Sequence, residues 1–303
     1  MTTKKSTTET GTFPEEHPYV RFGNGPENLM ILPGITLQNE PPSRLDAWTY
    51  RLGFGRFARN HTVFVVNRKR GMPPGYTTRD MAADYARVME EELGPSHVMG
   101  FSTGGHIAQY VALDRPDLVS SLTLVVAASR MSEAGCVICE RWRTLARQRR
   151  WLDLRADMAS VTVTGETNKR LAGAFMKVLG GLVLGMPSDP SDFVTTLEAD
   201  LGHDTTARLP ELSAPTLIVG GSVDPFFPEP LLRETAGKIP DAELRVYEGV
   251  GHGVPKERKR CYEEDALTFL NARSRRGREA TAETTGHTAD VGSAHDRKTT
   301  WTK

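Results

Sequence analysis

Short apolar runs alternate with longer amphipathic stretches along most of this chain. The runs are bounded by glycine, proline and polar residues, a pattern typical of strands buried inside a sheet. They lie at residues 18–23, 29–32, 62–66, 98–101, 122–127, 216–220 and 242–247. The stretches between them carry apolar residues three and four apart, which predicts helices that include residues 48–58, 78–93, 107–112 and 262–270. Strands that alternate with helices predict an α/β fold with a mostly parallel sheet covered on both faces.

The pattern differs in three other parts of the chain. Residues 130–204 predict consecutive helices without strands, and residues 171–183 within them are unusually apolar. Residues 1–17 and 274–303 contain few large apolar side chains and no periodicity, so we expect both segments to be disordered tails. The sequence therefore predicts one core, formed by residues 18–129 and 205–273, with a helical insertion at 130–204.

The segment 95–116 predicts a strand, a sharp turn and a helix, with Ser102 at the turn. The turn reads Gly100-Phe101-Ser102-Thr103-Gly104. So abrupt a reversal brings the residues two before and two after the serine close together, where side chains would collide, and this explains Gly100 and Gly104. Ser102 is then expected in strained backbone angles, exposed at a helix N-terminus whose partial positive charge favours an oxyanion.

This segment resembles the nucleophile elbow of the α/β-hydrolase superfamily. The resemblance implies an α/β-hydrolase fold in which residues 130–204 form a helical cap over the active site. It also implies that the apolar stretch at 171–183 faces the substrate cavity. Further, it implies a triad acid and a histidine downstream of Ser102, in that order.

Both expected residues follow predicted strands. Asp224 lies in Gly221-Ser222-Val223-Asp224-Pro225, and His252 lies in Gly249-Val250-Gly251-His252-Gly253. In the superfamily such segments commonly carry the triad acid and base. Among the other histidines, His61 and His97 precede their strands and His106 lies one helical turn beyond the serine, which leaves His203 as the second candidate for the base. A simple Asp-Pro turn is the alternative interpretation of Asp224.

The segment Pro33-Gly34-Ile35-Thr36 follows an early strand, at the place where the superfamily supplies an oxyanion N–H group. The resemblance assigns that donor to Ile35 and the second donor to Thr103. The usual histidine is replaced by Pro33, but the donor is a backbone group and is retained. An ordinary strand-ending turn is the alternative. For the basic cluster at 67–71 we favour a solvated loop over a site for an acidic substrate group.

The composition of the chain serves mainly to exclude classes of protein and of partner. With 303 residues and 38% hydrophobic content, the chain is long enough for one large core with an insertion. The formal net charge is zero and the pI is about 7.1, so nothing in the overall charge favours nucleic acid or an anionic membrane. No signal-like start and no run long enough for a membrane span is evident, and we expect a cytoplasmic protein. Three cysteines form no disulfide framework, and for the lone Cys-x-x-Cys at 136–139 we favour a structural role.

These features predict a serine hydrolase that cleaves a carboxylic ester or related acyl substrate through an acyl-enzyme on Ser102. Asp224 and His252 complete the predicted triad. We expect a small-molecule acyl substrate, no cofactor and no metal ion in this chemistry; the sequence leaves the oligomeric state open. The same scaffold supports enol-lactone hydrolysis, C–C bond hydrolysis and the cofactor-free perhydrolase activity of haloperoxidase-like members. An inactive binding module is the alternative from another class.

Overall fold

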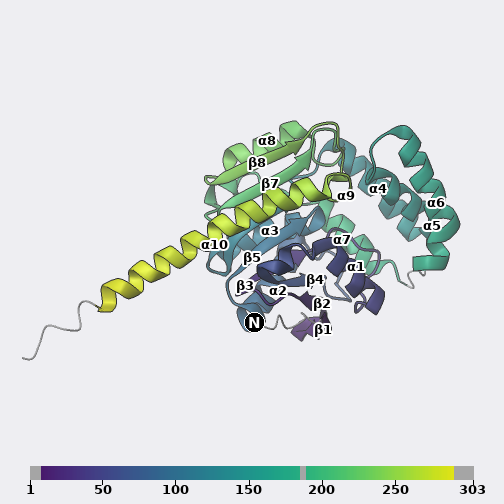
Figure 1. Ribbon diagram of the computed structural model, residues 1–303. Coiled ribbons are helices and arrows are strands. Elements are labelled where there is room, and N and C mark those ends of the chain that lie inside the picture. Colours follow the sequence, from purple (N-terminus) through teal and green to yellow (C-terminus); the bar gives the residue numbers. More distant parts are fainter. Residues whose placement is uncertain (1–7, 185–188, 290–303) are drawn as a thin grey trace, which may run out of the picture.

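The computed structural model describes residues 8–184 and 189–289, and within them the strands form one eight-stranded sheet (Figure 1). The spatial order is β1-β2-β4-β3-β5-β6-β7-β8. The first two pairings, β1 with β2 and β2 with β4, are antiparallel, and the others are parallel. The bounds are Glu9–Phe13, His17–Phe22, Glu27–Leu32, His61–Val66, Ser96–Phe101, Val119–Val125, Thr216–Gly221 and Ala242–Tyr247 for β1 to β8. The predicted mostly parallel α/β sheet is thus confirmed.

Helices cover both faces of this sheet. The α-helices α1 to α10 are Arg44–Phe54, Thr78–Val88, Thr103–Asp114, Glu133–Arg147, Trp151–Val161, Glu166–Leu184, Ser191–Leu201, Glu229–Lys238, Val254–Glu257 and Lys259–Ala289. Short helical turns η1 to η5 lie at Pro14–Glu16, Phe57–Arg59, Met89–Leu93, Pro116–Leu118 and Leu209–Glu211. No helix in the described ranges is long and apolar enough to cross a membrane.

The central strands are buried on both faces, and their sequences are therefore continuous apolar runs. Successive side chains of a strand point to opposite faces. In β3, Met30 and Leu32 join a core shared with α2 and α3, whereas Leu29 and Ile31 join a second core shared with α1 and α10. The two apolar layers hold the sheet rigidly, so the loops at its carboxyl edge start from fixed positions.

Polar caps set where α1 and α2 begin. Ser43 and Asp46 form a capping box at the start of α1, and Thr77 and Asp80 form one at the start of α2. The predicted helix at 48–58 was therefore displaced: α1 begins at Arg44, directly after its cap. An apolar pattern does not mark such a start, because the first turn of α1 is mostly solvent-exposed.

The prediction that residues 1–17 and 274–303 are disordered tails is wrong in part. Residues 9–17 are ordered, because β1 pairs along its length with β2 and Phe13 stacks on Tyr19 with ring centroids 4.1 Å apart. At the other end α10 continues to Ala289, and Ser274 is buried against the sheet. The expectations for residues 1–7 and 290–303 lie outside the described residues.

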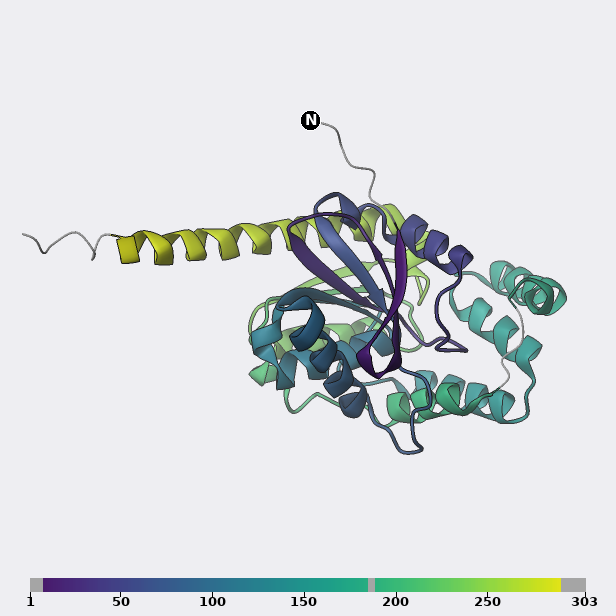
Figure 2. The ribbon, with the colours of Figure 1, turned by 90° about the horizontal axis from the view of Figure 1, so that it is seen from below.

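Helices α4 to α7 follow one another between β6 and β7 and gather at one end of the molecule (Figures 1 and 2). A bridge between Arg130 and Asp204 joins the two ends of this segment. It lies at the limits that the sequence analysis gives for the helical insertion. The segment therefore leaves and rejoins the core at one place, beside the carboxyl ends of β6 and β7.

Candidate active site

Three side chains from three loops meet at the carboxyl edge of the sheet. Ser102 directly follows β5, Asp224 follows β7 and His252 follows β8. The Ser102 hydroxyl donates to His252 Nε2 at 3.1 Å, and His252 Nδ1 donates to Asp224 Oδ2 at 2.8 Å. The structure thus brings together the three residues that the sequence predicts as nucleophile, base and acid.

Ser102 adopts a backbone conformation that side chains rarely take, with φ 49° and ψ −118°. The neighbouring glycines make this turn possible. A Cβ atom on Gly100 would lie 2.4 Å from the carbonyl oxygen of Gly104, and one on Gly104 would lie 2.1 Å from that of Leu32. Neither position has room for a side chain. The steric reason derived from the sequence is confirmed at Gly100, whereas Gly104 is required by its close approach to β3. The turn holds Ser102 at the start of α3, above the sheet.

Asp224 is fixed by its own loop. It is buried, and its Oδ1 accepts the backbone N–H groups of Phe226 at 2.9 Å and Phe227 at 3.4 Å. These bonds leave Oδ2 for His252. The His252 ring also packs against Phe226, with centroids 4.7 Å apart. The imidazole is therefore held from two sides, with Nε2 directed at Ser102.

Ile35 and Thr103, the predicted oxyanion donors, both line the cavity that contains Ser102. The loop that carries Ile35 passes directly beside the serine, because a Cβ atom on Gly34 would lie 3.5 Å from Ser102 Cβ. Thr103 is the first residue of α3, where backbone N–H groups point out of the helix. Both residues thus lie in the wall of the cavity beside Ser102.

Arg68 braces that loop, and here the sequence analysis was wrong. Arg68 belongs to the basic cluster for which we favoured a solvated loop, yet it is buried. Its guanidinium donates to the carbonyl oxygens of Pro33 at 3.2 Å and Gly34 at 3.0 Å, and to Thr36 Oγ1 at 2.9 Å. These three acceptors compensate for removing the charge from water. No pattern in the sequence separates this arginine from its exposed neighbour Arg70.

A second contact missed from the sequence reaches Thr103 from α7. Asp200 is buried, and its carboxylate accepts the Thr103 hydroxyl at 2.5 Å and His106 Nδ1 at 2.9 Å. Asp200 thereby connects the last helix of the insertion to the first turn of α3. Nothing in the sequence marks this residue, because its partners lie nearly a hundred positions away.

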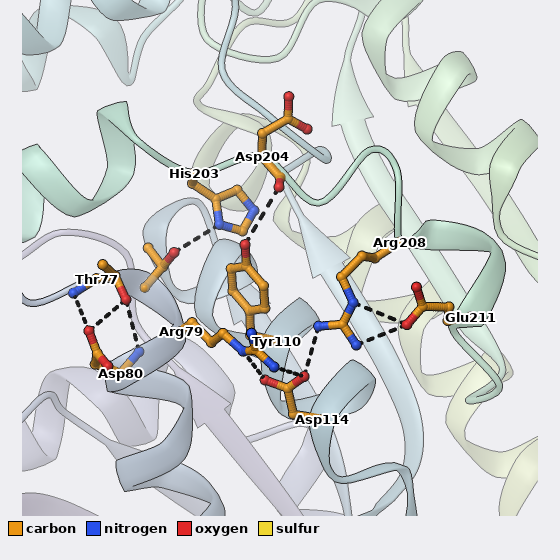
Figure 3. A network of polar contacts seen from close by, with 10 residues as sticks. Thr77, Arg79, Asp80, Tyr110, Asp114, His203, Asp204, Arg208 and Glu211 are labelled. Atoms are coloured by element: carbon orange, nitrogen blue, oxygen red, sulfur yellow. Dashed lines mark hydrogen bonds and ion pairs between the residues drawn. The ribbon is translucent and has the colours of Figure 1, made fainter.

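His203, the second candidate for the base, makes its contacts away from Ser102. Its ring stacks on that of His106 with centroids 4.0 Å apart, and its Nδ1 lies 3.0 Å from Thr78 Oγ1. Burial, together with the nearby His106, lowers the pKa of His203 well below its usual value. Figure 3 shows His203 beside Tyr110 in a polar network that connects α2, α3 and the segment after α7. His252, and not His203, contacts Ser102.

A cavity of about 660 Å³ opens over Ser102 and His252. Its apolar lining comes largely from the helical insertion, through side chains that include Trp142, Met158, Met176 and Leu197. The expectation that residues 171–183 face this cavity is wrong for Leu171 and Phe175, which are 64% and 60% exposed. Among the side chains of that stretch that the structure describes, Met176 is the one that borders it. An amphipathic pattern does not tell which face of α6 meets the cavity, and the side chains beyond Lys177 in this stretch lie outside the described ones.

Cationic side chains also border the cavity. Arg155 on α5 is buried, and burial lowers its pKa. Lys256 donates to Thr162 Oγ1 at 3.0 Å, and burial lowers the pKa of its ammonium group. Glu40 is among the acidic groups that line the same cavity, but it pairs with Arg70 at 2.9 Å. The cavity therefore combines an apolar lining with two cationic side chains, Arg155 and Lys256, and three acidic ones, Glu40, Asp46 and Asp200.

Cys139, also in the cavity wall, behaves as a small apolar group. It is buried, and burial raises the pKa of its thiol far above the usual value. Burial raises the pKa of Cys136 as well. Both thiols therefore stay protonated at neutral pH, in keeping with a structural role and against one as nucleophiles.

Comparison with known proteins agrees with this architecture. A model of the "Alpha/beta hydrolase family" matches residues 30–264. A 2-hydroxy-6-oxononadienedioate/2-hydroxy-6-oxononatrienedioate hydrolase from a Pseudomonas species is 29% identical over 243 residues, covering 72% of this chain and 83% of that protein.

Two solved structures share the fold. A putative non-heme bromoperoxidase from Mycobacterium tuberculosis superposes with a TM-score of 0.68 at 20% identity, covering 85% of this chain and 96% of the other. An enol-lactonase from Burkholderia xenovorans gives 0.69 at 16% identity, covering 87% and 100%. At such identities the likeness shows the fold and leaves the reaction to be argued from the site.

Proposed function

Because this chain belongs to the alpha/beta hydrolase family, we propose that it is a serine hydrolase that cleaves a carboxylic ester through an acyl-enzyme on Ser102. One observation carries the proposal: the unbroken series of hydrogen bonds from Asp224 through His252 to Ser102 at the floor of a cavity. A serine hydroxyl is too weakly acidic to attack an ester unaided, and this arrangement supplies the base that it needs.

In the first half of the reaction, Ser102 Oγ attacks the ester carbonyl while its proton passes to His252 Nε2. Asp224 stabilises the imidazolium that forms and keeps Nδ1 protonated. The tetrahedral intermediate collapses when the C–O bond to the alcohol breaks, and His252 returns the proton to the leaving oxygen. A water molecule, deprotonated by His252, then attacks the acyl-serine carbonyl. The bond to Ser102 Oγ breaks, His252 returns the proton to that oxygen, and the acid is released.

Backbone N–H groups of Ile35 and Thr103 would bind the negative oxygen of each tetrahedral intermediate. Losing one such donor typically raises the barrier by about 3–4 kcal/mol. Arg68 and Asp200 support this assignment, because they hold the Ile35 loop and the Thr103 side chain respectively. Donors fixed before the reaction need no reorganisation when the charge develops.

The cavity supports a small to medium acyl group. About 660 Å³ lies within the range of ordinary small-molecule sites, and its lining by Trp142, Met158, Met176 and Leu197 favours an aliphatic chain.

Hydrolysis of a C–C bond in a carboxylate-bearing substrate is the second candidate. Arg155 and Lys256 favour it, since both place positive charge beside the cavity. The Pseudomonas relative is named as a hydrolase of dioates, which carry two carboxylates.

Steady-state kinetics with p-nitrophenyl esters of two to eight carbons tests the proposal. We expect saturable turnover of these esters, with a higher kcat/KM than for an enol lactone, a dienedioate C–C substrate or peracid formation. Turnover of the dienedioate with negligible ester hydrolysis would replace the ester assignment with the second candidate.

Two neighbouring residues on α6 give a matched test of the cavity wall. Met176→Ala enlarges the cavity and should raise the kcat/KM ratio of octanoate to butyrate ester about tenfold. Phe175→Ala removes an exposed side chain and should change that ratio by less than about twofold. If Met176→Ala changes the ratio no more than about twofold, Met176 does not limit the length of the acyl chain.

A further inference from the structure

Three potential metal ligands lie together at the amino edge of the sheet, opposite the edge that carries Ser102. Glu27 begins β3, His61 begins β4 and His97 is the second residue of β5. The strands are neighbours: Glu27 pairs directly with His61, and His97 pairs with Leu29. One ligand atom from each of the three side chains lies within 4.8 Å of the other two.

The two imidazole rings are oriented by their Nδ1 atoms. His61 Nδ1 donates to the carbonyl oxygen of Phe57 at 3.3 Å, and His97 Nδ1 lies 2.8 Å from Ser121 Oγ. These contacts leave Nε2 as the remaining ring nitrogen of each histidine, and His97 Nε2 lies 3.5 Å from Glu27 Oε2. Metal-binding histidines are commonly held in this way, by a protein partner on the nitrogen that does not coordinate.

The charges of these three side chains favour the binding of a cation. Both rings are buried, which disfavours the charged imidazolium form. A neutral imidazole is the form that coordinates a metal. The carboxylate of Glu27 supplies a negative charge, and its side chain is 30% exposed, so it is less buried than the two rings.

A surface hollow gives access to this group of side chains, and a serine hydroxyl contacts it. A surface hollow of about 500 Å³ is lined by Glu27 and His61 and gives room for water beside them. Ser274, from α10, borders the same hollow, donates to Glu27 and lies 3.3 Å from His97 Nε2. The hydroxyl therefore holds the carboxylate toward the histidines.

We propose that Glu27, His61 and His97 bind one divalent transition-metal ion, with water completing its coordination. Two imidazoles and one carboxylate are a ligand set typical of zinc. Bonds of about 2.0–2.2 Å would draw the three ligand atoms closer together, a movement that the Glu27 side chain can supply. The ion would tie β3, β4 and β5 together and, through Ser274, join them to α10. It has no part in the chemistry at Ser102.

Cobalt titration of the full chain, stripped of metals with EDTA, tests the site. We expect one Co²⁺ per chain with the intense visible absorption of four- or five-coordinate Co(II), and its displacement by Zn²⁺. Saturating Zn²⁺ should also raise Tm by several degrees, because an ion that binds only the folded chain stabilises it. Absence of a stoichiometric Co²⁺ spectrum in the wild-type chain would overturn the proposal.

Substitutions of the proposed ligands test where the ion binds. Glu27→Gln should weaken Co²⁺ binding at least about tenfold, as losses around metal sites typically do. The control Glu90→Gln alters an exposed carboxylate that pairs with Arg115 and should bind Co²⁺ like wild type. His61→Gln provides a second ligand variant if Glu27→Gln does not fold. Unchanged affinity in a folded ligand variant would place the bound ion elsewhere and overturn the assignment.

Discussion

Replacing Ser102 with alanine should lower kcat/KM for a p-nitrophenyl ester by a factor of about 10⁴ or more, with the fold retained. The variant loses the only atom that forms the acyl-enzyme. His252→Ala should lower the rate by a similar factor, because the hydroxyl then has no acceptor for its proton. Since the two residues act as a unit, the double variant should be little slower than either single one.

Ser120→Ala is the matched control. Ser120 is an exposed serine on β6, away from the cavity, and its loss should change kcat/KM by less than about twofold. Substantial ester hydrolysis by folded Ser102→Ala would mean that another group performs the attack.

Asp224→Asn should lower kcat/KM by a factor of about 10⁴ while leaving the loop geometry intact. The reason lies in the two oxygens of Asp224. Oδ1 accepts the N–H groups of Phe226 and Phe227, so the asparagine must keep its only oxygen there. Its NH₂ group then faces His252 Nδ1, which is forced to accept a hydrogen bond. The imidazole proton moves to Nε2, which can no longer take the proton of Ser102.

The same substitution at Asp204 serves as the control for Asp224→Asn. Asp204 is exposed, and its carboxylate accepts the backbone N–H of Thr206 at 2.8 Å. Its amide variant should retain activity within about twofold. If Asp224→Asn remains within a factor of about ten of wild type, Asp224 is not the triad acid.

Features that repeat along the chain or lie close together in it could be predicted from sequence. Apolar runs such as 29–32 and 62–66 predicted strands because both faces of a central strand are buried. The turn at Ser102 could be predicted because Gly100 is required by a steric contact within five residues, whereas the contact that requires Gly104 comes from Leu32 at the end of β3. Asp224 and His252 followed from their places after strands, since parallel strands bring their carboxyl ends to one edge.

Features that depend on distant partners could not be predicted. Arg68 looked like a solvated cation because its three acceptors belong to a loop more than thirty positions away. Asp200 contacts α3 from the far end of the insertion. The strand β1 contains few apolar residues and becomes ordered by pairing with β2. Each of these contacts exists only after the chain has folded, and none leaves a periodic pattern.

Labelling with a small fluorophosphonate tests the central claim, that Ser102 is an activated nucleophile, most directly. Such a probe phosphorylates a serine only where a base and oxyanion donors are assembled around it, and no natural substrate need be known. Intact-mass analysis should show one adduct on the wild-type chain, peptide mapping should place it at Ser102, and Ser102→Ala should take up none. A folded wild-type chain that stays unlabelled from neutral to mildly alkaline pH, or an adduct that persists in Ser102→Ala, would contradict the account, and the unlabelled result would favour an inactive binding module.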